Sequence, residues 1–164
     1  MLTGKQIFEK GIVTKVANPE KQVQQVGIDL TISYFSKVDG VGFIPKDGKT
    51  ILPNYTKLEW PEDNCLVLQP GVYECVFNEG CKFDSRTEGK IIHRSSILRS
   101  GSILMSAEFD PGFETENIGS FITVNMPIKI EKGARLGQMT CDLTDEEVEN
   151  TYNGQWKNDR QRKN

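Results

Sequence analysis

Short apolar runs and alternating apolar and polar positions dominate the chain after its first eleven residues. Such a period of two is typical of β-strands, because successive side chains of a strand point to opposite faces of its sheet. Turn-forming pairs such as Pro70 with Gly71 and Pro111 with Gly112 separate the runs. The predicted strands cover residues 26–34, 65–68, 72–76, 90–93, 102–105, 121–124 and 128–130. Many short strands at this spacing predict an all-β barrel or sandwich.

The first residues show a different pattern, which predicts a short N-terminal helix. Thr3 and Gln6 have the spacing of a capping box, Ile7 and Phe8 supply an apolar face, and Gly11 is a helix stop. We expect this helix to be the only one. Residues 40–64 are rich in Gly, Pro and Lys and are expected to form an excursion between two strands.

Length and composition narrow the class of protein. The chain has 164 residues, enough for one domain that buries its own core. It has no run close to the ~20 apolar residues of a membrane span and no signal-peptide core, so we expect an intracellular, cytoplasmic protein without a membrane partner. The net charge of −3 argues against nucleic acid as the main partner.

The cysteines do not form a metal-binding pattern. Cys65, Cys75, Cys81 and Cys141 lack paired spacing, and the chain has one histidine, His93. A zinc site needs about four such ligands. We therefore expect reduced, mostly buried thiols and a structural role for His93.

A cluster of donors points to phosphate binding. The segment Arg94-Ser95-Ser96-Ile97-Leu98-Arg99 places two guanidinium groups around two adjacent hydroxyls. Arginine matches phosphate oxygens with a rigid fork of N–H donors, and serine adds short neutral donors. Taken alone, the same segment is equally typical of an exposed turn.

Two further segments carry candidate chemistry. FDPGF places the carboxylate of Asp110 ahead of a Pro-Gly turn, where it either projects from a hairpin or caps its own backbone. GARLGQ places the amide of Gln138 near the start of a strand after a glycine turn. Its alternative is a plain hairpin with an exposed Gln138.

The charge changes sharply near the C-terminus. An acidic run, Asp142 to Glu149, precedes a tail with Lys157, Arg160, Arg162 and Lys163 against Asp159. The tail is either a solubilising end or an arm that closes over an anion and stacks Trp156 on a base. We accordingly divide the chain into a β domain, residues 1–152, and a basic arm, residues 153–164.

In order and spacing, these motifs resemble the dUTPase/dCTP deaminase superfamily. The resemblance rests on GIDL at residues 27–30, RSSILRSG, FDPGF and GARLGQ, and the opening helix and first strand are similar to the deaminase branch. It covers most of the chain and is weakest over residues 36–64 and 78–90. The resemblance implies a distorted β-barrel or jelly-roll subunit, a homotrimer, and active sites between subunits.

The resemblance also implies roles for individual residues. In that superfamily the RSS segment cradles a triphosphate, so Arg94, Ser95, Ser96 and Arg99 would bind phosphate oxygens. Gln138 would reach the phosphate or the attacking water, and Phe113 would lie against the deoxyribose of a pyrimidine deoxynucleoside triphosphate. Mg²⁺ would arrive with the triphosphate, held by its oxygens and water rather than by a protein cage.

Two reactions are open within the superfamily. A dUTPase-type hydrolase would use Asp110 to activate water for attack on the α-phosphate. A dCTP deaminase, which forms dUTP and ammonia, needs a glutamate near the base. Anchoring the strand after FDPGF on Asn125 places Ile122 where that glutamate belongs. We therefore expect hydrolysis of dUTP, and of dCTP as a second substrate. Deamination is one alternative, and binding without catalysis is another.

The tail resembles the deaminase branch more than the glycine-rich arm of typical dUTPases. The similarity lies in Tyr152-Asn153-Gly154-Gln155, followed by Trp156. We expect Tyr152 or Trp156 to cover the base, Gln155 to contact the substrate, and Lys157 and Arg160 to meet the terminal phosphates. Short nucleotide-pool enzymes of this branch suit a bacterium or a bacteriophage-infected cell.

Overall fold

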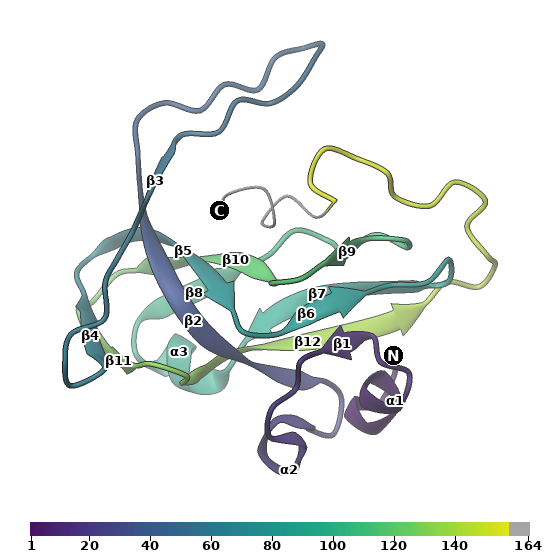
Figure 1. The fold of residues 1–164 in the computed structure, drawn as a ribbon, viewed down its shortest axis with the longest axis horizontal. Coiled ribbons are helices and arrows are strands. Elements are labelled where there is room, and N and C mark those ends of the chain that lie inside the picture. The colour runs from purple at the N-terminus through teal and green to yellow at the C-terminus, as the bar shows by residue number, and fades with distance from the viewer. Residues whose placement is uncertain (158–164) are drawn as a thin grey trace.

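The computed structural model describes residues 1–157 and shows a strongly curved antiparallel sheet of seven strands (Figure 1). The sheet runs in the order β7-β12-β2-β5-β10-β8, and β3 pairs with the end of β2. Its strands are β2 Ile28–Asp39, β3 Asn54–Lys57, β5 Gly71–Phe77, β7 Thr87–His93, β8 Ser102–Met105, β10 Gly119–Val124 and β12 Arg135–Leu143. The expected all-β, barrel-like fold is confirmed.

Two smaller sheets complete the described part of the chain. One contains β1 Val13–Thr14, β6 Gly80–Lys82 and β9 Glu114–Thr115, and the other pairs β4 Cys65–Leu68 with β11 Ile128–Glu131. The sequence does not indicate β1, β6 and β9, which have only two or three residues, or β3, whose four residues NYTK show no alternation of apolar and polar positions.

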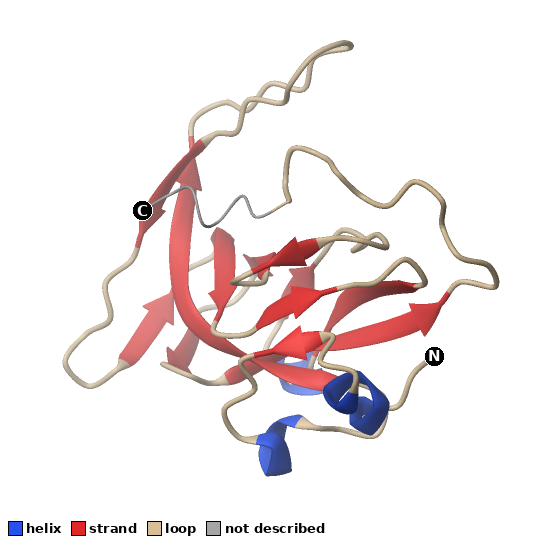
Figure 2. Ribbon diagram, turned by 45° about the vertical axis from the view of Figure 1, so that its right-hand side comes forward, coloured by secondary structure: helices blue, strands red, loops and turns tan. Residues whose placement is uncertain are grey.

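The helices are short and lie outside the barrel (Figure 2). In α1, Gly4–Glu9, Gln6 N donates to Thr3 Oγ1 at 3.2 Å and Thr3 N donates to Gln6 Oε1 at 2.9 Å, which confirms the capping box. The expectation of a single helix is wrong, because α2, Pro19–Gln22, and α3, Ser95–Arg99, also form. Both are too short for a helical period to show in the sequence. None of the described helices is long and apolar enough to cross a membrane.

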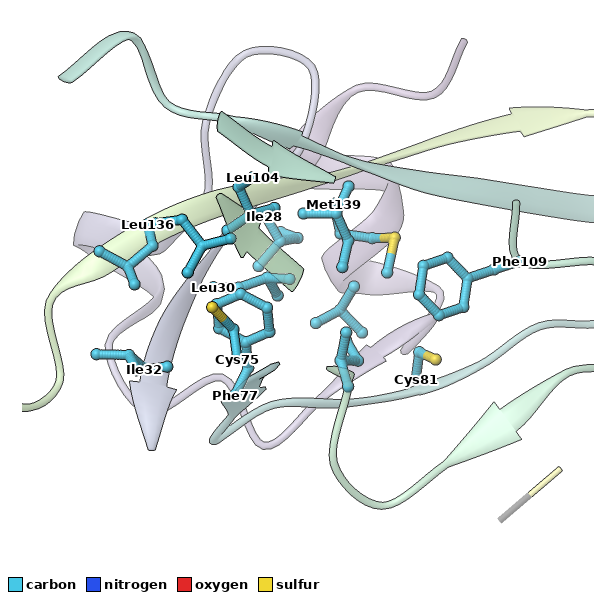
Figure 3. Close-up of a cluster of buried hydrophobic side chains, with 14 of the residues drawn as sticks. Ile28, Leu30, Ile32, Cys75, Phe77, Cys81, Leu104, Phe109, Leu136 and Met139 are labelled. Carbon is cyan, nitrogen blue, oxygen red and sulfur yellow. The ribbon is translucent and has the colours of Figure 1, made fainter. Parts of the chain in front are cut away.

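The core fills the space inside the curved sheet. Ile28, Leu30 and Ile32 of β2 point into it, together with Phe77 of β5 and Met139 of β12, all fully buried (Figure 3). Such burial of apolar side chains is the main stabilising contribution in a domain of this size.

A long ribbon connects β2 with β3 and projects from the barrel (Figures 1 and 2). We call residues 40–53 the projecting ribbon. Its two sides meet at one bridge, in which Phe43 and Ile51 exchange backbone hydrogen bonds of 2.9 Å. It exposes Val41, Ile44 and Ile51 by 90%, 82% and 62%, so its apolar side chains do not belong to the core.

Candidate functional site

Asp29 lies at the centre of a charged cluster where β2 and β12 pair. Its side chain is 1% exposed, and its carboxylate accepts hydrogen bonds from Arg135 Nη1 at 3.1 Å and Gln138 Nε2 at 3.3 Å. Arg94 Nε lies 3.3 Å from the same carboxylate. Asp29 and Gln138 are opposite each other in the register of the two strands. Strand pairing therefore brings the GIDL and GARLGQ segments together. We call Asp29, Arg94, Arg135 and Gln138 the Asp29 cluster.

Two guanidinium groups around one carboxylate give this cluster a surplus of positive charge. Burial raises the pKa of Asp29 above its ordinary value, while Arg94 and Arg135 act in the opposite direction. Both arginine side chains remain about one third exposed, at 34% and 33%. Arginines that are fixed by an internal carboxylate yet reach solvent are suited to bind an anion with several oxygens.

Backbone carbonyls hold the two arginines in place. Arg135 Nη1 donates to the Lys21 carbonyl at 2.6 Å, and Arg94 Nη1 donates to the Arg135 carbonyl at 3.2 Å. Neither arginine side chain needs to reorganise when an anion arrives, which lowers the entropic cost of binding.

The Arg-Ser-Ser segment forms the start of α3. Arg94 is the N-cap residue, and its backbone N–H donates to the Leu136 carbonyl at 3.0 Å. Ser95, Ser96 and Arg99 are exposed on α3. The structure thus joins Arg94 and Gln138 in one cluster and places both serines directly beside it. His93 Nδ1 lies 3.4 Å from the Leu104 carbonyl and is half-buried, which fits the structural role expected for it.

A second feature is a largely apolar pocket of about 630 Å³. It lies where β5 and β10 meet the loop that follows β8, and the projecting ribbon and the C-terminal segment complete its wall. The lining residues are Leu52, Tyr55, Val72, Glu74, Met105, Ser106, Ala107, Glu108, Phe109, Asp110, Phe113, Gly119, Ser120, Phe121, Tyr152 and Trp156. Four of the expected site residues line it, namely Asp110, Phe113, Tyr152 and Trp156.

The loop that carries Asp110 is held against β7 and the segment before it. Phe109 N donates to the Gly89 carbonyl at 2.7 Å, Gly112 N to the Asp84 carbonyl at 3.0 Å, and Phe83 N to the Phe113 carbonyl at 2.9 Å. Gly112 has φ +84°, a left-handed conformation that favours glycine. The carboxylate of Asp110 is exposed at the pocket, on a backbone fixed on both sides.

Asp84 supports this loop with its own side chain. Its carboxylate accepts hydrogen bonds from Thr87 Oγ1 at 2.7 Å and from Arg86 N at 2.9 Å. The hydrogen bond from Thr87 lowers the pKa of Asp84 below its ordinary value, although partial burial opposes the shift. The charged form of Asp84 therefore stabilises the turn on which the Asp110 loop rests.

The start of the C-terminal segment folds over the pocket. Tyr152 N donates to the Pro111 carbonyl at 2.7 Å, and the rings of Tyr152 and Phe113 meet edge to face at 5.4 Å. Trp156 N donates to Tyr152 Oη at 3.2 Å. Both aromatic residues expected to cover a base are thus brought to the pocket.

The remaining tail residues have other contacts. Gln155 Nε2 donates to the Thr50 carbonyl of the projecting ribbon at 3.0 Å, rather than lining the pocket. Lys157 Nζ lies 3.5 Å from the Tyr152 carbonyl. Arg160 lies outside the described residues.

Strand β10 contributes no carboxylate to the pocket. Ile122 is fully buried in the core and does not line the pocket, whereas the preceding residues Gly119, Ser120 and Phe121 do. No residue of β10 is acidic on either face. Besides Asp110, the pocket contains the buried Glu74 of β5 and the exposed Glu108.

The two features remain separate within one copy of the chain. None of the Asp29 cluster residues, and neither serine of α3, lines the described pocket. The sequence analysis assigned no role to Asp29 and Arg135, although they belong to the GIDL and GARLGQ motifs. The contact between the two residues depends on the pairing of β2 with β12, which these motifs do not reveal separately.

Comparison with known proteins agrees with this architecture. The family model described as dCTP deaminase-like matches residues 3–143. A deoxyuridine 5'-triphosphate nucleotidohydrolase of Methanocaldococcus jannaschii is 36% identical over 140 residues, covering 84% of this chain and 88% of that protein. A probable deoxyuridine 5'-triphosphate nucleotidohydrolase of Halobacterium salinarum is 32% identical over 145 residues, with 86% of each chain covered.

Among solved structures, the fold is similar to that of 2'-deoxycytidine 5'-triphosphate deaminase from Agrobacterium tumefaciens. The TM-score is 0.67 at 18% sequence identity, and the match covers 87% of this chain. It spans 47% of that longer protein. The likeness establishes a shared fold for the two chains.

Proposed function

Because this chain belongs to the dCTP deaminase-like family, we propose that it is a nucleotide pyrophosphohydrolase that converts dUTP and water to dUMP and pyrophosphate, with dCTP as a second substrate. The observation that carries this proposal is the exposed carboxylate of Asp110 in an apolar, aromatic-lined pocket. The similarity to proteins named deoxyuridine 5'-triphosphate nucleotidohydrolase supports it.

The pocket would hold the nucleoside. Its volume of about 630 Å³ falls within the range of small-molecule sites, and its walls are mostly apolar. Phe113 would lie against the deoxyribose, and Tyr152 or Trp156 would stack on the base, since every base offers an aromatic face. Gln155 and Lys157 would assist from the segment that closes the pocket.

Asp110 would orient and deprotonate the attacking water. The water oxygen forms a bond to the α-phosphorus while the bond to the bridging oxygen breaks, and pyrophosphate leaves with the electron pair. The water proton passes to the carboxylate of Asp110. A carboxylate in this role must lie within hydrogen-bond reach of the water, which an exposed side chain on a fixed loop can satisfy.

The Asp29 cluster would bind the phosphates. The donors to the phosphate oxygens would be Arg94, Ser95, Ser96 and Arg99. The terminal phosphate would be met by Lys157 and Arg160. Gln138 would reach the phosphate or the water. Two of the three guanidinium nitrogens of Arg94 face protein acceptors, so the third would serve the anion. Arg135 and Asp29 would orient these groups.

Mg²⁺ fits this arrangement as an ion that arrives with the triphosphate. The described residues contain no group of three or more His, Cys, Asp or Glu side chains that could hold a metal. Asp29 already faces two arginines and Gln138, so it is not arranged as a direct ligand. Phosphate oxygens and water would hold the ion, and the ion would neutralise charge on the triphosphate.

A homotrimer would join the two halves of the site. Because the Asp29 cluster and the pocket are separate in one chain, a complete site would combine one copy's cluster with another copy's pocket. The β domain would comprise residues 1–152, and residues 153–164 would form the basic arm that closes over the substrate.

A product assay tests the proposal directly. The protein is incubated with Mg²⁺ and dUTP, dCTP, dTTP or UTP in separate reactions, and the products are tested for monophosphate, pyrophosphate and ammonia. Monophosphate and pyrophosphate from dUTP are the expected result. Binding of every nucleotide without any product would assign the chain to the non-catalytic alternative.

A second candidate function is dCTP deamination, favoured by the buried carboxylate of Glu74 in the pocket wall. A glutamate beside the base could carry the protons that deamination requires. Ammonia and dUTP formed from dCTP would support this function against hydrolysis.

A further inference from the structure

A fully buried carboxylate, Glu79, lies between β5 and β6. Its exposure is 0%, and no cation among the described residues lies within salt-bridge distance of it. Three donors face it instead. Gln22 Nε2 lies 2.7 Å from Oε1, Thr31 Oγ1 lies 2.6 Å from Oε1, and Thr31 N lies 2.9 Å from Oε2. Burying a carboxyl group is costly unless its oxygens have hydrogen-bond donors, and these three donors supply both oxygens of Glu79.

One of these donors connects Glu79 to Asp29. Gln22, itself 2% exposed, donates from Nε2 to the backbone carbonyl of Asp29 at 3.0 Å as well as to Glu79. Its neighbour Lys21 supplies the carbonyl that accepts from Arg135. The α2 segment thus contacts both Asp29 and its partner arginine.

The other two donors hold β2 just after Asp29. Thr31, two residues further along β2, gives Glu79 both its backbone N–H and its hydroxyl. Thr31 is also the residue opposite Arg135 in the β2–β12 register, next to an irregularity between Arg135 and Gly137. Glu79 therefore contacts, through Gln22 and Thr31, the stretch of β2 from Asp29 to Thr31, near the place where the ladder with β12 is interrupted.

We infer that Glu79 is a positioning residue for the Asp29 cluster, acting through Gln22 and Thr31, and that hydrogen bonds to both of its carboxyl oxygens are required for anion binding by Arg94 and Arg135. The inference rests on the proposed function for the identity of the anion, a polyphosphate. A carboxyl group is needed here because both of its oxygens accept hydrogen bonds. The side-chain NH₂ of a glutamine would instead face an N–H donor of Gln22 or Thr31.

Glu79→Gln tests this role with a change of one atom. Binding of inorganic triphosphate and, separately, of deoxyuridine is measured by calorimetry on the full chain. We expect the Kd for triphosphate to rise at least about tenfold, because small displacements of oriented groups are costly. The Kd for deoxyuridine should stay within about twofold, since Glu79 does not line the pocket.

Gln22→Met provides a second variant, should Glu79→Gln fail to fold. It keeps the length of the side chain, removes both donated hydrogen bonds, and should weaken triphosphate binding in the same way. Ile130→Val, in β11 and away from the network, serves as a control that lowers the unfolding temperature without moving Asp29. Its triphosphate affinity should equal that of the wild type.

Two results would overturn the inference. One is unchanged triphosphate affinity in both network variants, and the other is an equal loss in Ile130→Val, which would mean that lowered stability alone weakens binding. Neither result depends on turnover. If the wild-type protein fails to hydrolyse dUTP, the proposed function fails while the triphosphate comparison still decides the role of Glu79.

Discussion

Phe113 and Tyr152 lie edge to face with their ring centroids 5.4 Å apart, although the strands β9 to β12 separate them in the chain. Such aromatic pairs contribute about 0.5–1.5 kcal/mol beyond the area they bury. The contact anchors the C-terminal segment on the loop that carries Asp110. The Asp110 loop and the C-terminal segment therefore form one continuous part of the pocket wall.

Trp156→Ala should raise the KM for dUTP about tenfold, because stacking of a base on an aromatic ring is worth about 1–3 kcal/mol. Removal of residues 153–164 should raise the KM at least as much, while the β domain, residues 1–152, stays folded. Steady-state kinetics with dUTP provide the measurement, and Trp156→Phe is the matched control. Wild-type KM values in the truncated chain would contradict the proposed role of the arm.

Asp110→Asn should reduce kcat by about 10²- to 10⁴-fold, the usual contribution of a general base, while dUTP still binds. Because Asp110 is exposed, the substitution should not change the unfolding temperature. Rates and nucleotide affinity are measured on the same preparation. Glu108→Gln, which changes another carboxylate of the pocket, should retain activity. Retained turnover in Asp110→Asn would exclude the water-activating role.

Asp84→Ala should lower the free energy of unfolding at pH 7 by about 1 kcal/mol, since Thr87 and Arg86 lose their acceptor. The folded pKa of Asp84 lies below its ordinary value, so its stabilisation is present above that ordinary value. It disappears as the pH falls through the folded pKa. Urea titrations from pH 7 to pH 3 should show the variant and the wild type converging at the acid end.

Alkylation should distinguish the four thiols. Burial raises the pKa of Cys75 far above its ordinary value and that of Cys141 to about 12, so neither forms a thiolate at neutral pH. Cys81 is also buried, whereas Cys65 is partly exposed. Iodoacetamide should label Cys65 in the native protein, and all four cysteines after unfolding, as measured by peptide mass spectrometry. Native labelling of Cys75 would contradict the burial described for β5.

The sequence predicted the strands whose apolar positions form a clear pattern. Residues 65–68 and 102–105 correspond to β4 and β8 at both ends. The helix α3 was missed because five residues with one buried side chain, Ile97, give no period. Residues 135–143 of β12 were recognised only at their start, through the turn before Gln138.

The candidate site was predictable where the chemistry is local. The Asp110 loop and the Arg-Ser-Ser segment are continuous in the chain, so their side chains indicate a role directly. The partnership of Asp29 with Arg135 and Gln138 depends on strand pairing between distant segments, which no local pattern encodes. The same reason hides Glu79, whose partners lie in α2 and β2.

Gly112 packs directly against the start of the C-terminal segment that closes the pocket. A Cβ atom at this position would lie 2.5 Å from Thr151 Cβ, closer than real contacts allow, and 3.1 Å from Tyr152 N, which is a tight contact. One added methyl group would therefore displace the backbone that leads into Tyr152 and Trp156. None of the residues that line the pocket would be substituted. A single substitution of Gly112 during evolution would therefore uncover the pocket by displacing Tyr152 and Trp156. The uncovered pocket would be open to different ligands.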